Sequence, residues 1–212
     1  MPKNGLGMDV LTAAEQRISW TFDTFEKVYV SFSGGKDSTV MLHLVMAEAI
    51  KRDRMVGVLF IDLEAQYKLT IDHVMACYQM YAEHIEPFWV SLPIHLRNAV
   101  SVFETHWVCW EPESKPAWVR EAPDMAIVDP DYFPFFRPGM EFEEFVPEFG
   151  EWYSQGVPTA CFVGIRTDES LNRWRTIASV HKTMYEARQY TTLVRPNLYN
   201  VYPVYDWKTA DL

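Results

Sequence analysis

The stretch from Val28 to Leu42 constrains the fold most strongly, because a strand pattern changes there into a helix pattern across two glycines. β-Branched and aromatic residues occupy alternate positions up to Phe32, and apolar residues recur at helical spacing from Val40 onward. Gly34 and Gly35 lie between the two patterns. The sequence therefore predicts a β-strand, a tight turn and an α-helix in direct succession.

This turn has the chemistry of a phosphate site. Gly34 and Gly35 have no Cβ atoms, so their backbone N–H groups can approach an anion closely. The helix that follows directs its first unpaired N–H groups and its positive dipole end at the same point. The hydroxyls of Ser33 and Ser38 and the ammonium of Lys36 surround that point. We interpret the turn as a binding site for nucleotide phosphate.

The residues Ser33–Ser38 do not follow the Walker pattern, because no glycine lies five residues before a Gly-Lys-Ser/Thr triplet. Asp37 is unexpected beside phosphate, but its carboxylate could cap the helix N-terminus or hold Mg²⁺ against phosphate oxygens. The alternative interpretation is an ordinary Ser/Gly turn between a strand and a helix.

Composition predicts a cytoplasmic protein that folds as one domain over residues 1–212. Hydrophobic residues make up 49% of the 212 residues, which is enough for a buried core. No run of eighteen apolar residues occurs, and the N-terminal residues lack a signal-peptide pattern, so we expect no membrane contact. Cys77, Cys109 and Cys161 are too widely spaced for a disulfide framework and are typical of a reducing compartment.

The net charge of −10 argues against a general basic surface for nucleic acid, although direct contact with nucleic acid stays open. The charge is unevenly distributed. Residues 111–151 contain eleven Asp or Glu and three Lys or Arg, a net of −8, so the rest of the chain carries −2. The acidic segment therefore lies outside the predicted phosphate turn and does not repel phosphate there.

Apolar patterns predict further elements around the turn. A capping box at Thr12–Glu15 begins a first helix, and Met55–Ile61 has the continuous apolar composition of a buried parallel strand. A helix is expected from Gln66 to about His84, with one side formed by Leu69, His73, Ala76, Met80 and Ile85. Further along the chain we expect a strand at Pro87–Ser91, a helix from about Phe142 to Ser154 and a strand at Thr159–Ile165. Short strands follow over Leu193–Trp207, and Asp206–Thr209 resembles a helix start. This order predicts an α/β fold with a doubly wound, mainly parallel sheet.

The regular pattern is interrupted by an insertion at about residues 92–158. Ten of the thirteen prolines lie between Pro87 and Pro158, together with many aromatic residues that need burial. We expect an irregular but packed segment. It could carry specificity or partner contacts beside the site, or it could only cover one edge of the sheet.

Two strand ends carry further candidate residues. Asp62, Glu64 and Tyr67 follow the second strand, and ligands of open α/β sheets bind beyond such carboxyl ends. After the strand at Thr159–Ile165, Gly164 permits a tight exit, Thr167 or Asp168 could cap the next helix, and the arginines Arg166, Arg173 and Arg175 could bind phosphate or sulfate oxygens. The alternative for the arginines is a solvated helix face.

The motif Ser33-Gly34-Gly35-Lys36-Asp37-Ser38, the strand end Phe60-Ile61-Asp62 and the segment Gly164–Ser170 resemble the phosphoadenosine phosphosulfate reductase-like branch of the PP-loop superfamily. The resemblance spans about residues 9–207 and implies an adenine nucleotide α-hydrolase-like fold. Within the branch, four segments are similar to the immunoglobulin-binding-protein regulator group: Phe60–Tyr67, Trp107–Trp110, Met140–Trp152 and Tyr202–Thr209. They are more loosely similar to the ATP pyrophosphatase component of DNA phosphorothioation systems.

The resemblance implies roles for individual residues. The loop would hold the β- and γ-phosphates of ATP, Asp37 would position Mg²⁺, and adenine would pack near the Ile61–Asp62 strand end. Lys36, Asp37 and Arg166 form the implied catalytic set. The positions implied to bind the nucleotide are Ser31, Ser33, Gly34, Gly35, Lys36, Asp37, Ser38, Ile61, Asp62, Leu63, Gly164, Arg166 and Arg173.

The leading functional hypothesis is an ATP pyrophosphatase that adenylates an acceptor in a sulfur-transfer or DNA phosphorothioation pathway. Sulfonucleotide reductases of the family use a cysteine in a Glu-Cys-Gly-Leu-His element, which this sequence lacks. A sulfonucleotide reductase stays an alternative, as does a nucleotide-sensing regulator without turnover. We expect a protein partner of a sulfur-transfer or regulatory system, and homo-oligomers are compatible with the sequence.

Overall fold

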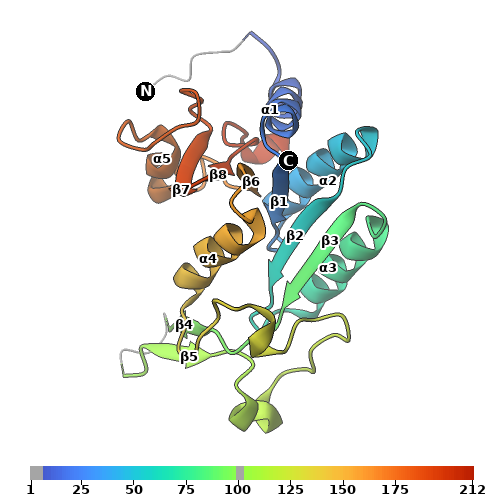
Figure 1. The fold of residues 1–212 in the computed structure, drawn as a ribbon, viewed down its shortest axis with the longest axis vertical. Coiled ribbons are helices and arrows are strands. Elements are labelled where there is room, and N and C mark those ends of the chain that lie inside the picture. The colour runs from blue at the N-terminus through green and yellow to red at the C-terminus, as the bar shows by residue number, and fades with distance from the viewer. Residues whose placement is uncertain (1–6, 99–102) are drawn as a thin grey trace.

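The computed structural model describes residues 7–98 and 103–212 (Figure 1). Two segments, residues 1–6 and 99–102, lie outside the described residues, and with them the N-terminal stretch in which the sequence shows no signal-peptide pattern. The helices are α1 (Val10–Thr24), α2 (Lys36–Lys51), α3 (Lys68–Met80), α4 (Phe142–Ser154) and α5 (Leu171–Ala178). The strands are β1 (Lys27–Ser31), β2 (Val56–Ile61), β3 (Ile85–Val90), β4 (His95–Arg97), β5 (His106–Val108), β6 (Thr159–Val163), β7 (Thr191–Arg195) and β8 (Leu198–Val201).

The central sheet has six strands in the order β3-β2-β1-β6-β8-β7. The pairs β3 with β2, β2 with β1, β1 with β6 and β6 with β8 are parallel, and only β7 runs antiparallel, beside β8 at the edge. The strand order reverses at β1, which lies between β2 and β6. The predicted doubly wound, mainly parallel sheet is therefore confirmed.

Helices cover both faces of the sheet. Alternate residues of each central strand point to opposite faces, and both sets are apolar and need burial. Val28 and Val30 of β1 are buried against α1, α2 and α3, with Phe22, Met41 and Val74 in the same cluster. Tyr29, between the two valines, is buried on the other face against α4. This arrangement explains why the central strands have nearly continuous apolar sequences.

The predicted insertion is packed rather than loose. The antiparallel pair β4 and β5, two 3-10 helices at Pro112–Ala117 and Pro130–Tyr132, and connecting loops lead to α4 (Figure 1). Phe133, Phe145 and Phe149 are almost fully buried, and their rings are in contact. Helix α4 has the predicted bounds, and Glu141 and Glu144 form a capping box at its start. The aromatic residues of the insertion thus form the second core cluster, beneath α4.

Three helices have boundaries that differ from the prediction. Helix α1 begins at Val10, since Asp9 and not Thr12 accepts the capping hydrogen bond; the distance from Thr12 N to Asp9 Oδ1 is 2.9 Å. Helix α3 is shorter than predicted at both ends. Leu69 and Met80 are exposed, and Ile71, Val74, Cys77 and Tyr78 form its buried face instead. Helix α5 is capped by Ser170, so the predicted caps Thr167 and Asp168 are wrong.

The C-terminal segment folds back onto α1. The guanidinium of Arg17 donates to the carboxylate of Asp206 at 2.8 and 2.7 Å and to the carbonyl of Pro203 at 2.6 Å. Trp207 Nε1 donates to Val10 O at 3.1 Å. The helix expected from Asp206 is only a short 3-10 turn at Thr209–Asp211. None of the helices in the described part of the chain has the length and apolar character needed to cross a bilayer.

The packing of α4 gives a stability prediction. Phe149→Ala removes a ring that is fully buried between β1, β3 and the insertion, and we expect the free energy of unfolding to fall by about 3 to 5 kcal/mol. Phe142→Ala on the same helix is the control, because this ring is 37% exposed. Denaturant unfolding followed by circular dichroism measures both. Equal losses in the two variants would contradict the assignment of α4 to the core.

Candidate functional site

The sheet topology brings two distant segments to one crevice. Strands β1 and β6 are parallel neighbours with Ser31 beside Val163, so the loops after them leave the same edge of the sheet. The order of the strands reverses here, with β2 and β3 on one side of β1 and β6 and β8 on the other (Figure 1). Open α/β sheets bind ligands at such a switch point, beyond the carboxyl ends of the strands. The loop Ser33–Ser38 and the segment after β6 meet at this point.

The loop between β1 and α2 exposes several backbone donors. Gly34 has a φ of +72°, a conformation that favours glycine, and Gly35 is the N-cap of α2 with no side-chain capping bond. No residue within the described ranges accepts a hydrogen bond from the backbone amides of Lys36, Asp37 or Ser38. These amides begin α2, where the helix dipole also favours an anion. The loop is thus shaped to bind an anion through its amides.

Side chains of the loop complete this arrangement. The hydroxyls of Ser33 and Ser38 lie 3.0 Å apart, and Ser38 Oγ donates to Gly35 O at 2.9 Å. Lys36 is exposed and has no ion-pair partner among residues 7–98 and 103–212. Ser31, also expected at the site, is half-buried as the last residue of β1. The predicted loop residues are therefore brought together around one point, with a free ammonium group beside it.

Asp37 and Arg166 form a buried ion pair across the crevice. Arg166 Nε donates to Asp37 Oδ2 at 2.9 Å, and the two side chains are 4% and 10% exposed. Asp37 therefore does not cap α2. The interpretation of its carboxylate as a helix cap is wrong. Its second oxygen, Oδ1, is buried and has no hydrogen-bond partner within the described part of the chain. An unpartnered carboxylate oxygen beside an anion site is able to accept a cation.

The other predicted arginines differ in their positions. Glu169 accepts a hydrogen bond from the Arg166 amide at 3.1 Å and pairs with Arg173, so Arg173 lies beside the crevice. Burial by itself raises the pKa of Glu169, but the hydrogen bonds from Arg166 N–H and Arg173 outweigh it, and the pKa lies below its usual value. Arg175 is exposed on α5. Arg166 is thus the central arginine of the site, and Arg173 is linked to it through Glu169.

Gly164 fixes the distance between the two segments. A Cβ atom at this position would lie 2.9 Å from Ser38 Cα and 3.0 Å from Ser38 N. Real side chains essentially never approach a backbone this closely, so only glycine fits between β6 and the start of α2. Its predicted role as a tight strand exit is better described as a close approach of two backbones.

The acidic side chains after β2 contact the insertion, whereas the sequence predicts that they lie near the nucleotide. The carboxylate of Asp62 is fully buried and accepts hydrogen bonds from Trp89 Nε1 at 2.8 Å and Glu64 N at 2.9 Å, and it pairs with Arg120. Its side chain therefore anchors the insertion and does not face the loop. Glu64 is also buried and accepts from Val119 N at 2.5 Å.

The neighbouring residues of the β2 end complete this description. Ile61 and Leu63 are half-buried beside Asp62, and Tyr67 is 87% exposed. Sequence reasoning missed the role of Trp110, whose Nε1 donates to Asp62 O at 2.7 Å. It also missed His73, whose Nε2 lies 2.9 Å from Thr39 Oγ1 at the start of α2. Both contacts join residues more than thirty positions apart, and no local pattern signals them.

A family comparison supports the nucleotide-site interpretation. The sequence model described as the phosphoadenosine phosphosulfate reductase domain matches residues 27–104, which include β1, the loop, α2, β2, α3 and β3. Over these residues, about a third of the chain, the protein is similar to this domain, which is part of the PP-loop superfamily. The resemblance noted in the sequence is confirmed, and Ser33–Ser38 can be called the PP-loop. The finer likeness to particular groups of the branch stays a prediction.

A relative covers nearly the whole chain. The uncharacterized protein YbdN of Escherichia coli (strain K12) is 47% identical over 210 residues, 98% of this chain and 51% of that protein. The chain thus spans about half the length of the curated relative it matches. The similarity extends well beyond the PP-loop and includes the insertion.

Two solved structures have a loosely similar arrangement. Candida glabrata FMN adenylyltransferase in complex with ATP matches 95% of this chain and 51% of its own, with 15% identity and a TM-score of 0.49. Yeast FAD synthetase in complex with FAD matches 100% of this chain and 59% of its own, with 14% identity and a TM-score of 0.47. Likeness at this level assigns no function.

The cysteines are placed in the core. Cys77, Cys109 and Cys161 are all buried, and each is free of a disulfide. Burial raises the pKa of the Cys109 and Cys161 thiols to about 12 and also raises the pKa of Cys77. A reactive thiol needs exposure and a lowered pKa, and these residues have neither. Their predicted packing role is confirmed by their burial.

The thiols give a direct prediction. We expect none of the three to react with a chromogenic disulfide reagent at pH 8 within minutes in the folded protein, because the groups are buried and protonated. All three should react after unfolding in guanidinium chloride. The absorbance of the released thiolate counts the reacting groups. A cysteine that reacts rapidly in the native state would contradict a purely structural role.

Gly164 gives a second prediction. Gly164→Ala forces a methyl group against the Ser38 backbone, and we expect the free energy of unfolding to fall by about 1 to 3 kcal/mol. Gly35→Ala is the matched control within the PP-loop. Gly35 has a φ of −78°, and the nearest atom to its added Cβ lies at 3.4 Å. Thermal and denaturant unfolding compare the two, and a tolerated Gly164→Ala would disprove the close backbone approach.

Proposed function

We propose that this protein binds ATP at the PP-loop and cleaves it between the α- and β-phosphates, transferring the adenylyl group to an acceptor. The observation that supports this most directly is the group of unpaired amides at Lys36–Ser38 beside the free Lys36 ammonium. Three N–H groups and a positive charge suit a polyphosphate better than a neutral ligand. The match of residues 27–104 to a sulfonucleotide-using family supports an adenine nucleotide as the ligand.

The nucleotide is oriented by the two sides of the crevice. The PP-loop amides with Lys36 bind the β- and γ-phosphates, and the Ser33 and Ser38 hydroxyls donate to their oxygens once these enter the loop. Adenine packs beside Ile61 and Leu63 at the end of β2, where side chains are half-buried and apolar. The carboxylate of Asp62 does not bind the nucleotide, because it already has partners on β3 and in the insertion.

The residues present are suited to Mg²⁺ in this site. Mg²⁺ is commonly held by one or two carboxylates together with substrate phosphates. Asp37 offers the buried, unpartnered Oδ1 beside the PP-loop, and no group of three metal-ligating side chains exists among the described residues. Asp37 would therefore hold the ion jointly with phosphate oxygens, and the ion would neutralise charge on the leaving pyrophosphate.

Arg166 stabilises the reaction centre. Its guanidinium is held by Asp37 through Nε, while Nη1 lies 3.5 Å from Thr209 Oγ1. A guanidinium fixed in this way is oriented before ATP arrives, so it loses little freedom when it contacts the α-phosphate. An oxygen or sulfur nucleophile of the acceptor forms a bond to the α-phosphorus, and the bond to the bridging oxygen breaks. The acceptor is left adenylated, its proton passes to solvent, and pyrophosphate leaves.

The acceptor belongs to a sulfur-transfer or DNA phosphorothioation system in this proposal. Two alternatives have their own support. A sulfonucleotide reductase is favoured by the family match, whereas the three buried cysteines of the described chain argue against a thiol nucleophile in this part of the protein. A nucleotide-sensing regulator would use the same loop without turnover. The products formed from each nucleotide separate the three.

Lys36 gives the decisive test. Lys36→Ala removes a charge-assisted contact to phosphate, and we expect the affinity for ATP and Mg²⁺ to fall roughly 10- to 100-fold in calorimetric titration. Lys51→Ala is the matched control, because Lys51 is an exposed lysine at the other end of α2. The unaltered protein should form pyrophosphate and the adenylated acceptor from ATP when the acceptor is present, and free AMP only when a second nucleophile displaces it from the acceptor.

Other outcomes of that experiment contradict specific parts of the proposal. No binding of ATP by the unaltered protein would remove the site itself. Binding of ATP without release of pyrophosphate or formation of an adenylated acceptor, with every candidate acceptor, would favour the regulator. Release of sulfite from a sulfonucleotide in a thioredoxin-coupled assay would favour the reductase. Equal affinities of the Lys36→Ala and Lys51→Ala variants would show that the nucleotide binds elsewhere.

A further inference from the structure

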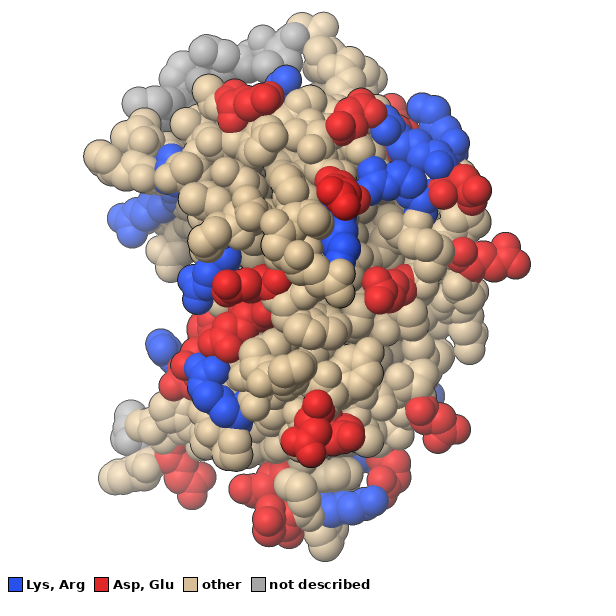
Figure 2. Space-filling model, in the orientation of Figure 1, with Lys and Arg blue, Asp and Glu red and all other residues tan. Residues whose placement is uncertain are grey.

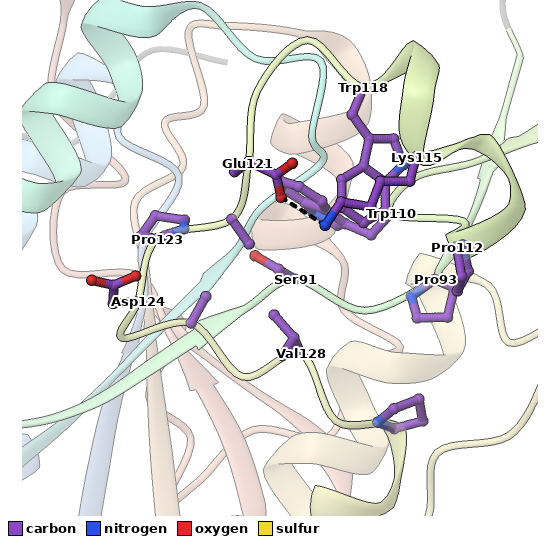
Figure 3. A pocket seen from close by; sticks show the side chains of 13 residues that line it. Ser91, Pro93, Trp110, Pro112, Lys115, Trp118, Glu121, Pro123, Asp124 and Val128 are labelled. Carbon is purple, nitrogen blue, oxygen red and sulfur yellow. Dashed lines mark ion pairs between the residues drawn. The ribbon is translucent and has the colours of Figure 1, made fainter.

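A second cavity lies beyond the end of β3, outside the PP-loop crevice. It has a volume of about 400 Å³ and is bounded by Ser91, which directly follows β3, and by residues of the insertion (Figure 3). Ligand pockets have volumes of roughly 300 to 1,000 Å³, so this one is suited to a small molecule rather than to a peptide or a nucleic acid.

Ser91 supplies the polar group at the base of this cavity. The residue is 3% exposed, and its hydroxyl has no hydrogen-bond partner within the described part of the chain. Figure 3 shows the hydroxyl directed toward the side of the pocket formed by Glu121 and Pro123. A buried hydroxyl without a partner is costly, and most such groups in folded proteins are satisfied. A ligand that hydrogen-bonds to this hydroxyl would remove the cost.

The remaining walls are flat and largely apolar. The rings of Trp110 and Trp118 meet edge to face at 5.0 Å between centroids and form one wall. Both indole N–H groups already donate to backbone carbonyls, Trp110 to Asp62 O and Trp118 to Glu111 O. Other positions of the lining are prolines, which have no N–H to offer: Pro93, Pro112, Pro123 and Pro130. Such walls favour a planar aromatic molecule over one with many polar groups.

The charged side chains at the opening of the cavity indicate which ligand charge is favoured. Lys115 pairs with Glu121 at 3.1 Å, and both side chains are largely exposed. Asp124 adds a carboxylate that has no ion-pair partner among the described residues. Lys115 Nζ lies 5.4 Å from the centroid of the Trp118 ring, so this wall already accommodates a cation. The surrounding segment is acidic, and Figure 2 shows Asp and Glu side chains over the part of the molecule where Figure 1 places the insertion. The lining itself carries one cation, Lys115, and two carboxylates, Glu121 and Asp124, and this net negative charge disfavours an anion.

We propose that this cavity is a binding site for a small planar aromatic molecule, neutral or cationic, that carries one hydrogen-bonding group for the hydroxyl of Ser91. The site is separate from the PP-loop and does not depend on the function proposed for it. Its ligand stacks against Trp118, enters past the Lys115–Glu121 pair and places its polar group at Ser91.

Three probes with one ring system and different charges test the class of ligand. They are 2-naphthalenemethanol, 2-naphthylmethylamine and 2-naphthoate, each titrated into the full-length protein by saturation-transfer NMR and calorimetry in the absence of nucleotide. We expect the alcohol and the amine to bind at least about tenfold more tightly than the carboxylate. Equal binding of all three, or preference for the carboxylate, would overturn the proposal.

Variants locate the binding. Trp118→Ala should weaken binding of the alcohol and the amine roughly tenfold, because it removes the stacking wall. Trp174→Ala is the matched control, since Trp174 is a partly exposed tryptophan on α5 outside the cavity. Retained affinity in Trp118→Ala, or an equal loss in Trp174→Ala, would place the probes elsewhere.

Ser91→Ala provides a second variant that does not depend on the tryptophan wall. It removes an unpartnered hydroxyl, so we expect the melting temperature to stay the same or rise, while the affinity for 2-naphthalenemethanol falls about 3- to 10-fold. A lower melting temperature with unchanged affinity would show that the hydroxyl has only a structural role. Because nucleotide is absent from these titrations, a negative result leaves the proposed adenylyl transfer untouched.

Discussion

The buried ion pair between Asp37 and Arg166 is the contact on which the arrangement of the site depends. It joins the first turn of α2 to the segment after β6, residues 129 positions apart in the chain. Removing two charges from water is costly, and a buried pair repays this only with good geometry and further hydrogen bonds. Here one carboxylate oxygen is left without a partner within the described residues, so the pair is incomplete in the protein alone. The pair thus fixes where the two loops meet and leaves one oxygen available for a cation.

A second buried carboxylate organises the insertion. Asp62 follows β2 and binds Trp89 of the neighbouring strand together with Arg120 of the insertion, and its carbonyl accepts from Trp110. Proline has no backbone N–H to donate, so in this proline-rich segment side-chain anchors add to backbone bonds such as the one from Ile127 N to Trp89 O at 2.7 Å. The phenylalanines beneath α4 bury apolar surface, and the hydrogen bonds of Asp62 fix where the insertion lies against the end of β2. For this reason the insertion is a fixed wall of the molecule rather than a loose cover.

The sequence predicts the sheet well because its strands have apolar runs whose burial needs no knowledge of partners. The Met55–Ile61 run corresponds to β2, and the bounds of α4 agree with those expected from the sequence. Helix starts are less predictable, since several residues near each start are able to cap it: Asp9 competes with Thr12, and Ser170 with Asp168. The PP-loop residues were foreseen as one cluster because they are adjacent in the chain. The partners of Asp37 and Asp62 were not, because both are set by contacts across the folded sheet.

The ends of β2 and β3 link the PP-loop crevice to the cavity in the insertion. Ile61 and Leu63 lie on the side proposed to receive adenine, and Trp110, bonded to the intervening Asp62 carbonyl, is part of the cavity wall. A shift of the β2 end on nucleotide binding would therefore move Trp110, and with it the edge-to-face contact to Trp118. Coupling between two sites requires a physical element that both sites bias. The hydrogen bond from Trp110 Nε1 to Asp62 O is the contact that joins the end of β2 to the wall of the cavity.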